Sequence, residues 1–150
     1  MDAVTYPNLE VVKFIQDHVV PVRLSFDAKP ESLDFNVKWT PTLVVLDSDG
    51  TEHHRTTGFL APEELVPMIL LGIGKSHFDR EEYKEAIASL DRLLRDYSQS
   101  DSCPEAIYYG GVSRYKSTQE AQPLKESYEK LHSEYPSSEW AKRAAPYRLL

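Results

Sequence analysis

Residues 39–50, with the sequence WTPTLVVLDSDG, decide the architecture of the first part of this chain. Pro41 stands just before the apolar run of residues 43–46, and it marks the start of a buried strand because proline cannot donate to a strand ladder. Asp49 and Gly50 then form a turn, so residues 51–58 are predicted to fold back as the second strand of a hairpin.

The residues around this hairpin predict an alternation of helix and strand. Asn8 is a suitable N-cap for the amphipathic helix that follows it. Residues 19–26 alternate between apolar and polar side chains and predict a strand. Pro30 fits the first turn of a short helix. After the hairpin, a helix is predicted to open at Pro62 and to kink or restart at Pro67.

The second half of the chain is helical and repeats itself. An offset of 38 residues aligns Leu71 with Tyr109 and Tyr109 with Tyr147, and it also aligns Gly72 with Gly110. Each unit holds two helical patterns, and a further helix begins a third unit. Paired helices that repeat at such a period indicate a helical solenoid, in which each unit buries its apolar face on its neighbour.

Residues 35–42 (FNVKWTPT), the strand after them and the hairpin resemble the later part of the thioredoxin-like family. In that family a threonine or similar residue precedes a cis-proline that faces a redox-active cysteine pair, and Thr40 and Pro41 stand at the matching place. The resemblance covers about residues 1–71. It implies a cis bond before Pro41, a form that costs an X-Pro bond only about 0.5–1 kcal/mol.

This resemblance lacks the front of the family's fold. The first strand, which is central in the family's sheet, and the cysteine pair have no counterpart, and Cys103 is the only cysteine. The resemblance thus implies an incomplete, redox-inactive α/β domain that begins partway through the fold. Because a missing central strand leaves backbone groups unpaired, we expect one of two outcomes. Either residues 22–26 lie directly beside residues 43–46, or two chains complete one another's sheet as a homodimer.

The second half resembles the tetratricopeptide repeat (TPR) family. Gly74, Phe78, Tyr83 and Leu90 fall where that family places small and large packing residues, and the sequence YPSS at residues 135–138 closes a unit in the family's manner. The expected fold class is therefore α/β plus all-α. A partial thioredoxin-like domain of residues 1–71 precedes a short TPR-like helical array of residues 72–150.

Composition disfavours several function classes. Asp and Glu outnumber Lys and Arg by 24 to 17, a formal charge of -7, which disfavours binding to nucleic acid or to an anionic membrane. No leader sequence or apolar span is recognisable, so a cytoplasmic location is expected. His53 and His54 are neighbours on a strand and point to opposite faces, so they cannot chelate one metal ion together. No cofactor motif occurs either.

Cys103 stands at a predicted helix start, where the helix dipole would lower the pKa of a thiol. A single cysteine without a basic partner is more often inert, which is the preferred interpretation.

Together these patterns predict a non-catalytic protein-protein interaction module that binds peptide or protein segments and has no enzymatic activity of its own. The candidate binding residues lie in the proline segment and on the first helices of the repeats: Trp39, Thr40, Pro41, Thr42, Lys75, Tyr109 and Lys116. In the alternative interpretation, the chain is the C-terminal part of a thiol-disulfide oxidoreductase or chaperone whose cysteine pair lies upstream of Met1. A third is that the repeats mainly dimerise the protein.

Overall fold

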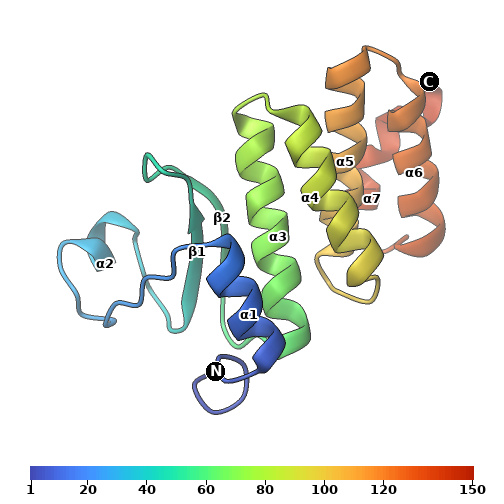
Figure 1. The fold of residues 1–150 in the computed structure, drawn as a ribbon. Coiled ribbons are helices and arrows are strands. Elements are labelled where there is room, and N and C mark those ends of the chain that lie inside the picture. The colour runs from blue at the N-terminus through green and yellow to red at the C-terminus, as the bar shows by residue number, and fades with distance from the viewer.

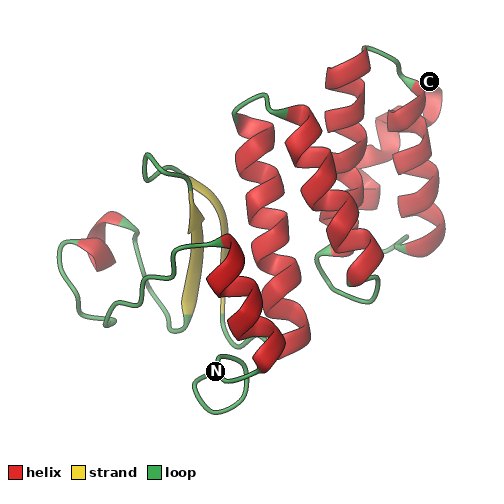
Figure 2. Cartoon of the chain, in the orientation of Figure 1, coloured by secondary structure: helices red, strands yellow, loops and turns green.

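The computed structural model describes residues 1–150 and has two parts, a small α/β part and a helical array (Figures 1 and 2). The first part contains α1 (Leu9–His18), α2 (Glu31–Asp34), β1 (Thr42–Leu46) and β2 (Glu52–Thr57). The second contains α3 (Pro62–Asp79), α4 (Tyr83–Asp96), α5 (Cys103–Thr118), α6 (Gln122–Glu134), α7 (Glu139–Ala144) and the 3-10 helix η1 (Ala145–Leu149). This arrangement confirms the predicted fold class. None of the helices has the length and apolar character needed to cross a membrane.

Helix α1 begins where the sequence predicts. The Asn8 side-chain oxygen accepts hydrogen bonds from the backbone N–H groups of Glu10 and Val11, at 3.0 and 3.3 Å. These bonds satisfy two of the donors that a helix start leaves without intrahelical partners. Val11 and Phe14 are buried on the inner face of α1, where they join the same hydrophobic cluster as residues of α3.

The predicted hairpin is also present. Strands β1 and β2 are antiparallel, with Thr42 opposite Thr57. In the turn between them, the Asp47 carboxylate accepts hydrogen bonds from the N–H groups of Asp49 and Thr51, both at 2.9 Å. Gly50 has a φ of +82°, a conformation that glycine adopts without steric penalty. Local turn chemistry thus accounts for the reversal of the chain.

The strand predicted for residues 19–26 is wrong. The sheet has only two strands, and β1 has only β2 beside it, so the expected pairing of residues 22–26 with residues 43–46 is wrong as well. In Figure 1 the chain between α1 and α2 instead forms a wide loop on the side of the hairpin away from the helical array. An alternating pattern becomes a strand only where a neighbour pairs its backbone groups, and no neighbour does so here.

Helix α3 belongs to both parts of the molecule. It is a single helix from Pro62 to Asp79, so it passes through Pro67 without restarting, and the boundary predicted between residues 71 and 72 falls inside it. Pro67 lies early in the helix, where its missing N–H leaves one carbonyl of the first turn without the usual intrahelical donor. One stretch of α3 packs on the hairpin and another on α4, which explains why it is buried over most of its length.

Successive helices of the array pack side by side as antiparallel pairs, α3 with α4 and α5 with α6, and α7 begins a third unit (Figure 1). Buried residues Leu90, Leu93 and Ala106 connect the first pair to α5. A second cluster, which contains Ile107, Leu131, Ala141 and Ala144, joins α5, α6 and α7. Each helix pair therefore buries its apolar side on the next pair, as a helical solenoid requires.

Candidate protein-interaction surfaces

The proline segment forms an exposed loop at the start of β1. The peptide bond between Thr40 and Pro41 is cis, as is the one between Lys29 and Pro30. The Thr42 hydroxyl donates a hydrogen bond to the Trp39 carbonyl oxygen at 2.6 Å, which holds the loop closed. The Trp39 side chain is 68% exposed. This loop therefore offers a large aromatic side chain to solvent beside the hairpin.

Lys75 and Tyr109 lie together at the junction of β2, α3 and α5. Lys75 Nζ donates to Glu105 Oε1 at 2.7 Å and lies 5.3 Å from the centroid of the Tyr109 ring. The same nitrogen is 3.3 Å from His54 Nδ1. The Lys75 and Glu105 side chains are only 17% and 16% exposed. The charge of Lys75 is therefore neutralised inside the molecule and is not presented to a ligand.

The surroundings of this ion pair shift the pKa of two neighbouring side chains. Burial, together with the positive charge of Lys75, lowers the pKa of His54, so its imidazole is neutral near pH 7. Burial raises the pKa of the Tyr109 hydroxyl. The junction thus holds one compensated ion pair and two neutral rings.

Lys116 lies apart from this junction. It is exposed in the last turn of α5 and forms no ion pair. Because a helix rises about 1.5 Å per residue, Lys116 is about 10 Å further along α5 than Tyr109. The structure therefore brings Lys75 and Tyr109 together and leaves Lys116 at the end of the same helix.

An aromatic row crosses the first helix of each pair. It consists of Phe78 on α3, Tyr109 on α5 and Trp140 on α7, all half-buried. The ring centroids of Phe78 and Tyr109 are 5.2 Å apart, and those of Tyr109 and Trp140 are 5.7 Å apart. Such spacings are typical of edge-to-face and tilted aromatic contacts. Tyr108 packs beside the row, 5.2 Å from Trp140.

Sequence reasoning selected Tyr109 from this row and did not select Phe78 or Trp140 as binding residues. The offset of 38 residues that reveals the repeat does not align these three positions. Equal spacing of the three aromatic residues along the chain is the signal that could have indicated them. The three rings come into contact because of the way in which α3, α5 and α7 are shifted relative to one another along their axes.

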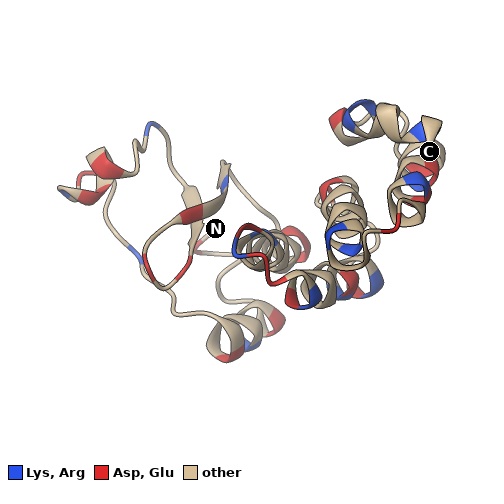
Figure 3. Ribbon diagram, turned by 90° about the horizontal axis from the view of Figure 1, so that it is seen from above, with Lys and Arg blue, Asp and Glu red and all other residues tan.

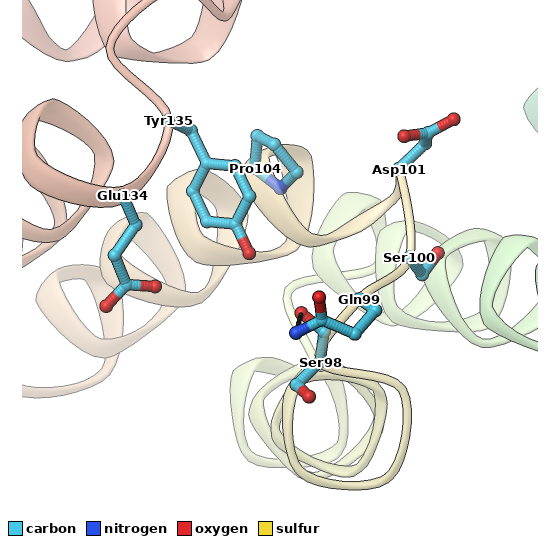
Figure 4. A pocket seen from close by; sticks show the side chains of 7 residues that line it. All are labelled: Ser98, Gln99, Ser100, Asp101, Pro104, Glu134 and Tyr135. Atoms are coloured by element: carbon cyan, nitrogen blue, oxygen red, sulfur yellow. Dashed lines mark hydrogen bonds between the residues drawn. The ribbon is translucent and has the colours of Figure 1, made fainter.

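Two surface hollows lie where elements of the fold meet. One, of about 250 Å³, lies between β2, α3 and the loop before α5, and its wall includes His54, Glu64 and Met68. The other, of about 510 Å³, is an open polar hollow. Its lining is shown in Figure 4: Ser98, Gln99, Ser100, Asp101, Pro104, Glu134 and Tyr135. The two carboxylates in Figure 4 lie on opposite sides of this hollow, so they do not converge on one ligand.

No catalytic constellation is recognisable at these places. No group of three or more His, Cys, Asp or Glu side chains is arranged to hold a metal ion. Cys103 is buried, and its thiol donates to the Tyr97 carbonyl oxygen at 3.2 Å. Burial raises the pKa of the Cys103 thiol, which keeps it protonated and weakly nucleophilic.

Comparison with known proteins finds two families in the chain. Residues 3–71 match the family model of a thioredoxin-like domain, and residues 69–100 match that of the tetratricopeptide repeat. No curated protein and no solved structure matches the chain. The two families indicate a role in protein interaction or in a redox-related process, and TPR repeats generally mediate protein-protein interactions. The two matches meet within α3, so the family models find a thioredoxin-like domain at residues 3–71 followed by a tetratricopeptide repeat at residues 69–100.

Proposed function

We propose that this chain is a non-catalytic interaction module that binds an extended peptide or protein segment along the aromatic row. The aromatic row itself carries this proposal. Stacked helix pairs present their first helices on one concave side, and Phe78, Tyr109 and Trp140 come from three such helices. Aromatic side chains are enriched at the energetic centres of protein interfaces because they bury a large area with few rotatable bonds.

The charges around the row favour an apolar ligand. Glu105 neutralises Lys75 beneath Tyr109, so this part of the row offers an aromatic surface without a free cation. In Figure 3, basic and acidic residues are interspersed along the helices and do not gather in one patch. We therefore propose that binding depends on the apolar side chains of the segment, with little contribution from long-range attraction.

The loop of Trp39, Thr40, Pro41 and Thr42 is proposed as a second contact. Its exposed indole lies just before the start of β1. A second copy of the chain is a further candidate partner, because the outer edge of β1 has no strand beside it.

The two tryptophans allow the two surfaces to be tested separately, since Trp39 lies in the loop and Trp140 in the row. We would titrate the variants Trp39→Phe and Trp140→Phe with peptides selected from a random phage-displayed library. Binding along the row should shift the emission of Trp140 in the Trp39→Phe variant. Tyr109→Ala should weaken binding at least tenfold, as loss of an interface anchor does.

The matched control is Tyr128→Ala, which removes a half-buried tyrosine from α6, the second helix of its pair. It should leave the affinity unchanged. Equal affinity of the Tyr109→Ala variant and the unmodified chain would contradict the row as the binding surface. A signal confined to Trp39 would assign binding to the loop instead.

The alternative proposal is that the chain supplies the C-terminal part of a thiol-disulfide oxidoreductase or chaperone whose cysteine pair lies upstream. The match of residues 3–71 to a thioredoxin-like domain supports it. In an insulin-reduction assay, this chain alone should show no activity because its one thiol is buried and protonated. If a longer open reading frame with a cysteine pair exists, the longer chain should be active and its Pro41→Ala variant impaired.

A further inference from the structure

The outer edge of β1 offers a row of unpaired backbone groups. The N–H of Gly58 donates to the carbonyl of Pro41, and bonded positions alternate along an antiparallel ladder. The N–H and C=O groups of Thr42, Val44 and Leu46 therefore point away from β2. No hydrogen bond from a turn, a loop or a helix cap uses these groups either. Such an edge can accept only another extended backbone.

The same chain also carries a strand-like segment that has no strand beside it. Residues 20–26, with the sequence VPVRLSF, alternate as a half-buried strand does, yet residues 20–24 form no backbone hydrogen bond. The apolar side chains of Val20, Val22, Leu24 and Phe26 are 90%, 76%, 53% and 57% exposed. Solvent-exposed apolar side chains in such a continuous series indicate a surface that another molecule covers.

This exposure is confined to the first part of the molecule. Apart from Leu149 and Leu150 at the C-terminus, every exposed large hydrophobic side chain lies within residues 4–59. The helices of the array cover one another's large apolar side chains, whereas the α/β part leaves several of its own exposed to solvent. Apart from the local turn at Ser25, the free segment is anchored within the chain through Arg23, which forms an exposed ion pair with Asp2 at 2.9 Å. Exposed ion pairs contribute little to stability, so this contact can be exchanged.

We infer that two copies of the chain form a symmetric dimer in which each lays residues 20–26 antiparallel along the outer edge of β1 of the other. The second copy is the fitting occupant because one chain supplies both the free edge and the free strand. A two-fold arrangement then uses both at once and leaves neither open. The inference is independent of peptide binding along the aromatic row.

One register satisfies the backbone of both strands. Val22 lies opposite Val44 of the second copy, which places Val20 opposite Leu46 and Leu24 opposite Thr42. These pairs form about six hydrogen bonds in each ladder. Pro21 then falls between bonded positions, where its missing N–H is not needed.

The register also settles which face is covered. Because Val45 packs on α3 at Gly72, its neighbours Val44 and Leu46 point to the face of the sheet away from α3. Directly opposed residues share a face, so Val20, Val22 and Leu24 of the second copy cover Val44 and Leu46. Arg23 falls on the α3 side, where its long side chain can reach solvent past the edge of the sheet.

The first test is the molar mass of the full chain by sedimentation equilibrium. The unmodified chain should have the mass of a dimer. Val22→Lys should weaken the dimer at least tenfold because it places a charge at the centre of the new strand pair. Val44→Pro should do the same because it removes an N–H that only the second copy uses, and proline is tolerated at such an edge position.

Three controls separate pairing from misfolding. Leu33→Lys changes an exposed leucine of α2 outside the register, and it should keep the dimer mass. All three variants should keep the helical circular dichroism of the unmodified chain. In a Cys103→Ser background, the pair Val22→Cys with Val44→Cys should form a disulfide between copies. Val22→Cys with Thr42→Cys should not, because these positions are displaced by two residues in the register.

A monomeric mass for the unmodified chain would overturn the inference. So would a dimer that both Val22→Lys and Val44→Pro leave intact. A dimer without the Val22–Val44 disulfide would overturn the proposed register and with it the pairing of these two segments.

Discussion

At the residue scale, His53 has the most unusual surroundings of the titratable groups. Its Nδ1 is 2.6 Å from Asp79 Oδ2, its Nε2 is 3.0 Å from Asp47 Oδ2, and its side chain is 4% exposed. A neutral imidazole has one N–H, so it can donate to both carboxylates only when protonated. Burial lowers the pKa of His53, but the two hydrogen bonds outweigh it, and the pKa is raised.

The stability of the fold should therefore depend on pH through His53. A raised pKa means that the folded state holds the proton more tightly, so this contribution is complete below about pH 6.5, the ordinary pKa of histidine. It is lost as the pH rises through the raised pKa of the folded state. His53→Asn should lower the free energy of unfolding by about 1 kcal/mol at pH 6 and by less at pH 8.5. Urea denaturation at both values measures this.

The control is His132→Asn, which changes an exposed histidine of α6 that has no hydrogen-bond partner. His54 has a lowered pKa, so its contribution to the free energy of unfolding changes with pH in the opposite direction. Both the unmodified chain and the His53→Asn variant contain His54, so the difference between their free energies of unfolding reports on His53. A His53→Asn variant with the same loss at both pH values would contradict a protonated His53.

At the scale of elements, contact between the hairpin and α3 depends on a glycine. A Cβ built on Gly72 would lie 2.6 Å from Val45 Cγ2, far inside ordinary contact distance. The hairpin can lie this close to the helix only because residue 72 has no side chain. Residues 43–46 were predictable as a strand from their apolar run. That they pack on α3 at this residue follows only from the assembled structure.

Gly72→Ala should therefore destabilise the protein although alanine is the better helix former. Overpacking should lower the free energy of unfolding by about 1–3 kcal/mol, more than the roughly 1 kcal/mol that helix propensity returns. Adding Val45→Ala should recover part of the loss, and a double-mutant cycle by urea denaturation gives the coupling. Gly110→Ala is the matched control, since its Cβ would meet only the flexible end of Arg114. A neutral Gly72→Ala would contradict the close approach.

At the scale of the whole molecule, one hydrophobic cluster runs through both parts. It contains Val11 and Phe14 of α1, most of the inner face of α3, and Leu90 and Leu93 of α4. The thioredoxin-like part therefore rests on the first repeat. This sharing explains how a hairpin with only two strands is held in place, since an isolated pair of strands is marginally stable at best.

A change in the first repeat should consequently loosen the hairpin. Leu90 is fully buried, and Leu90→Ala should lower the free energy of unfolding by about 2–5 kcal/mol. Hydrogen exchange should show loss of protection in β1 and β2 together with α4. Leu9→Ala removes an exposed leucine of α1 and should change neither. Two separate unfolding transitions in the unmodified chain would contradict the shared core.

Features that depend on neighbours along the chain could be predicted from the amino-acid sequence alone. The cap at Asn8 and the turn at Gly50 are local, because their hydrogen bonds join residues two to four positions apart. The helical repeats were also readable, since apolar periodicity sets the buried face of each helix. Of the proposed aromatic row, the sequence suggested Tyr109 as a candidate binding residue, whereas its neighbours Phe78 and Trp140 were not candidates.

The places where distant segments meet could not be predicted in this way and follow from the packing of the folded chain. Residues 19–26 have the pattern of a strand but remain unpaired, because a strand needs a neighbour that pattern alone does not supply. Lys75 was expected to face a ligand, but it turns to Glu105, which is thirty positions away in the sequence. Pairing and burial depend on which surfaces come together in space, and that information lies in the packing of α3 against both halves of the chain.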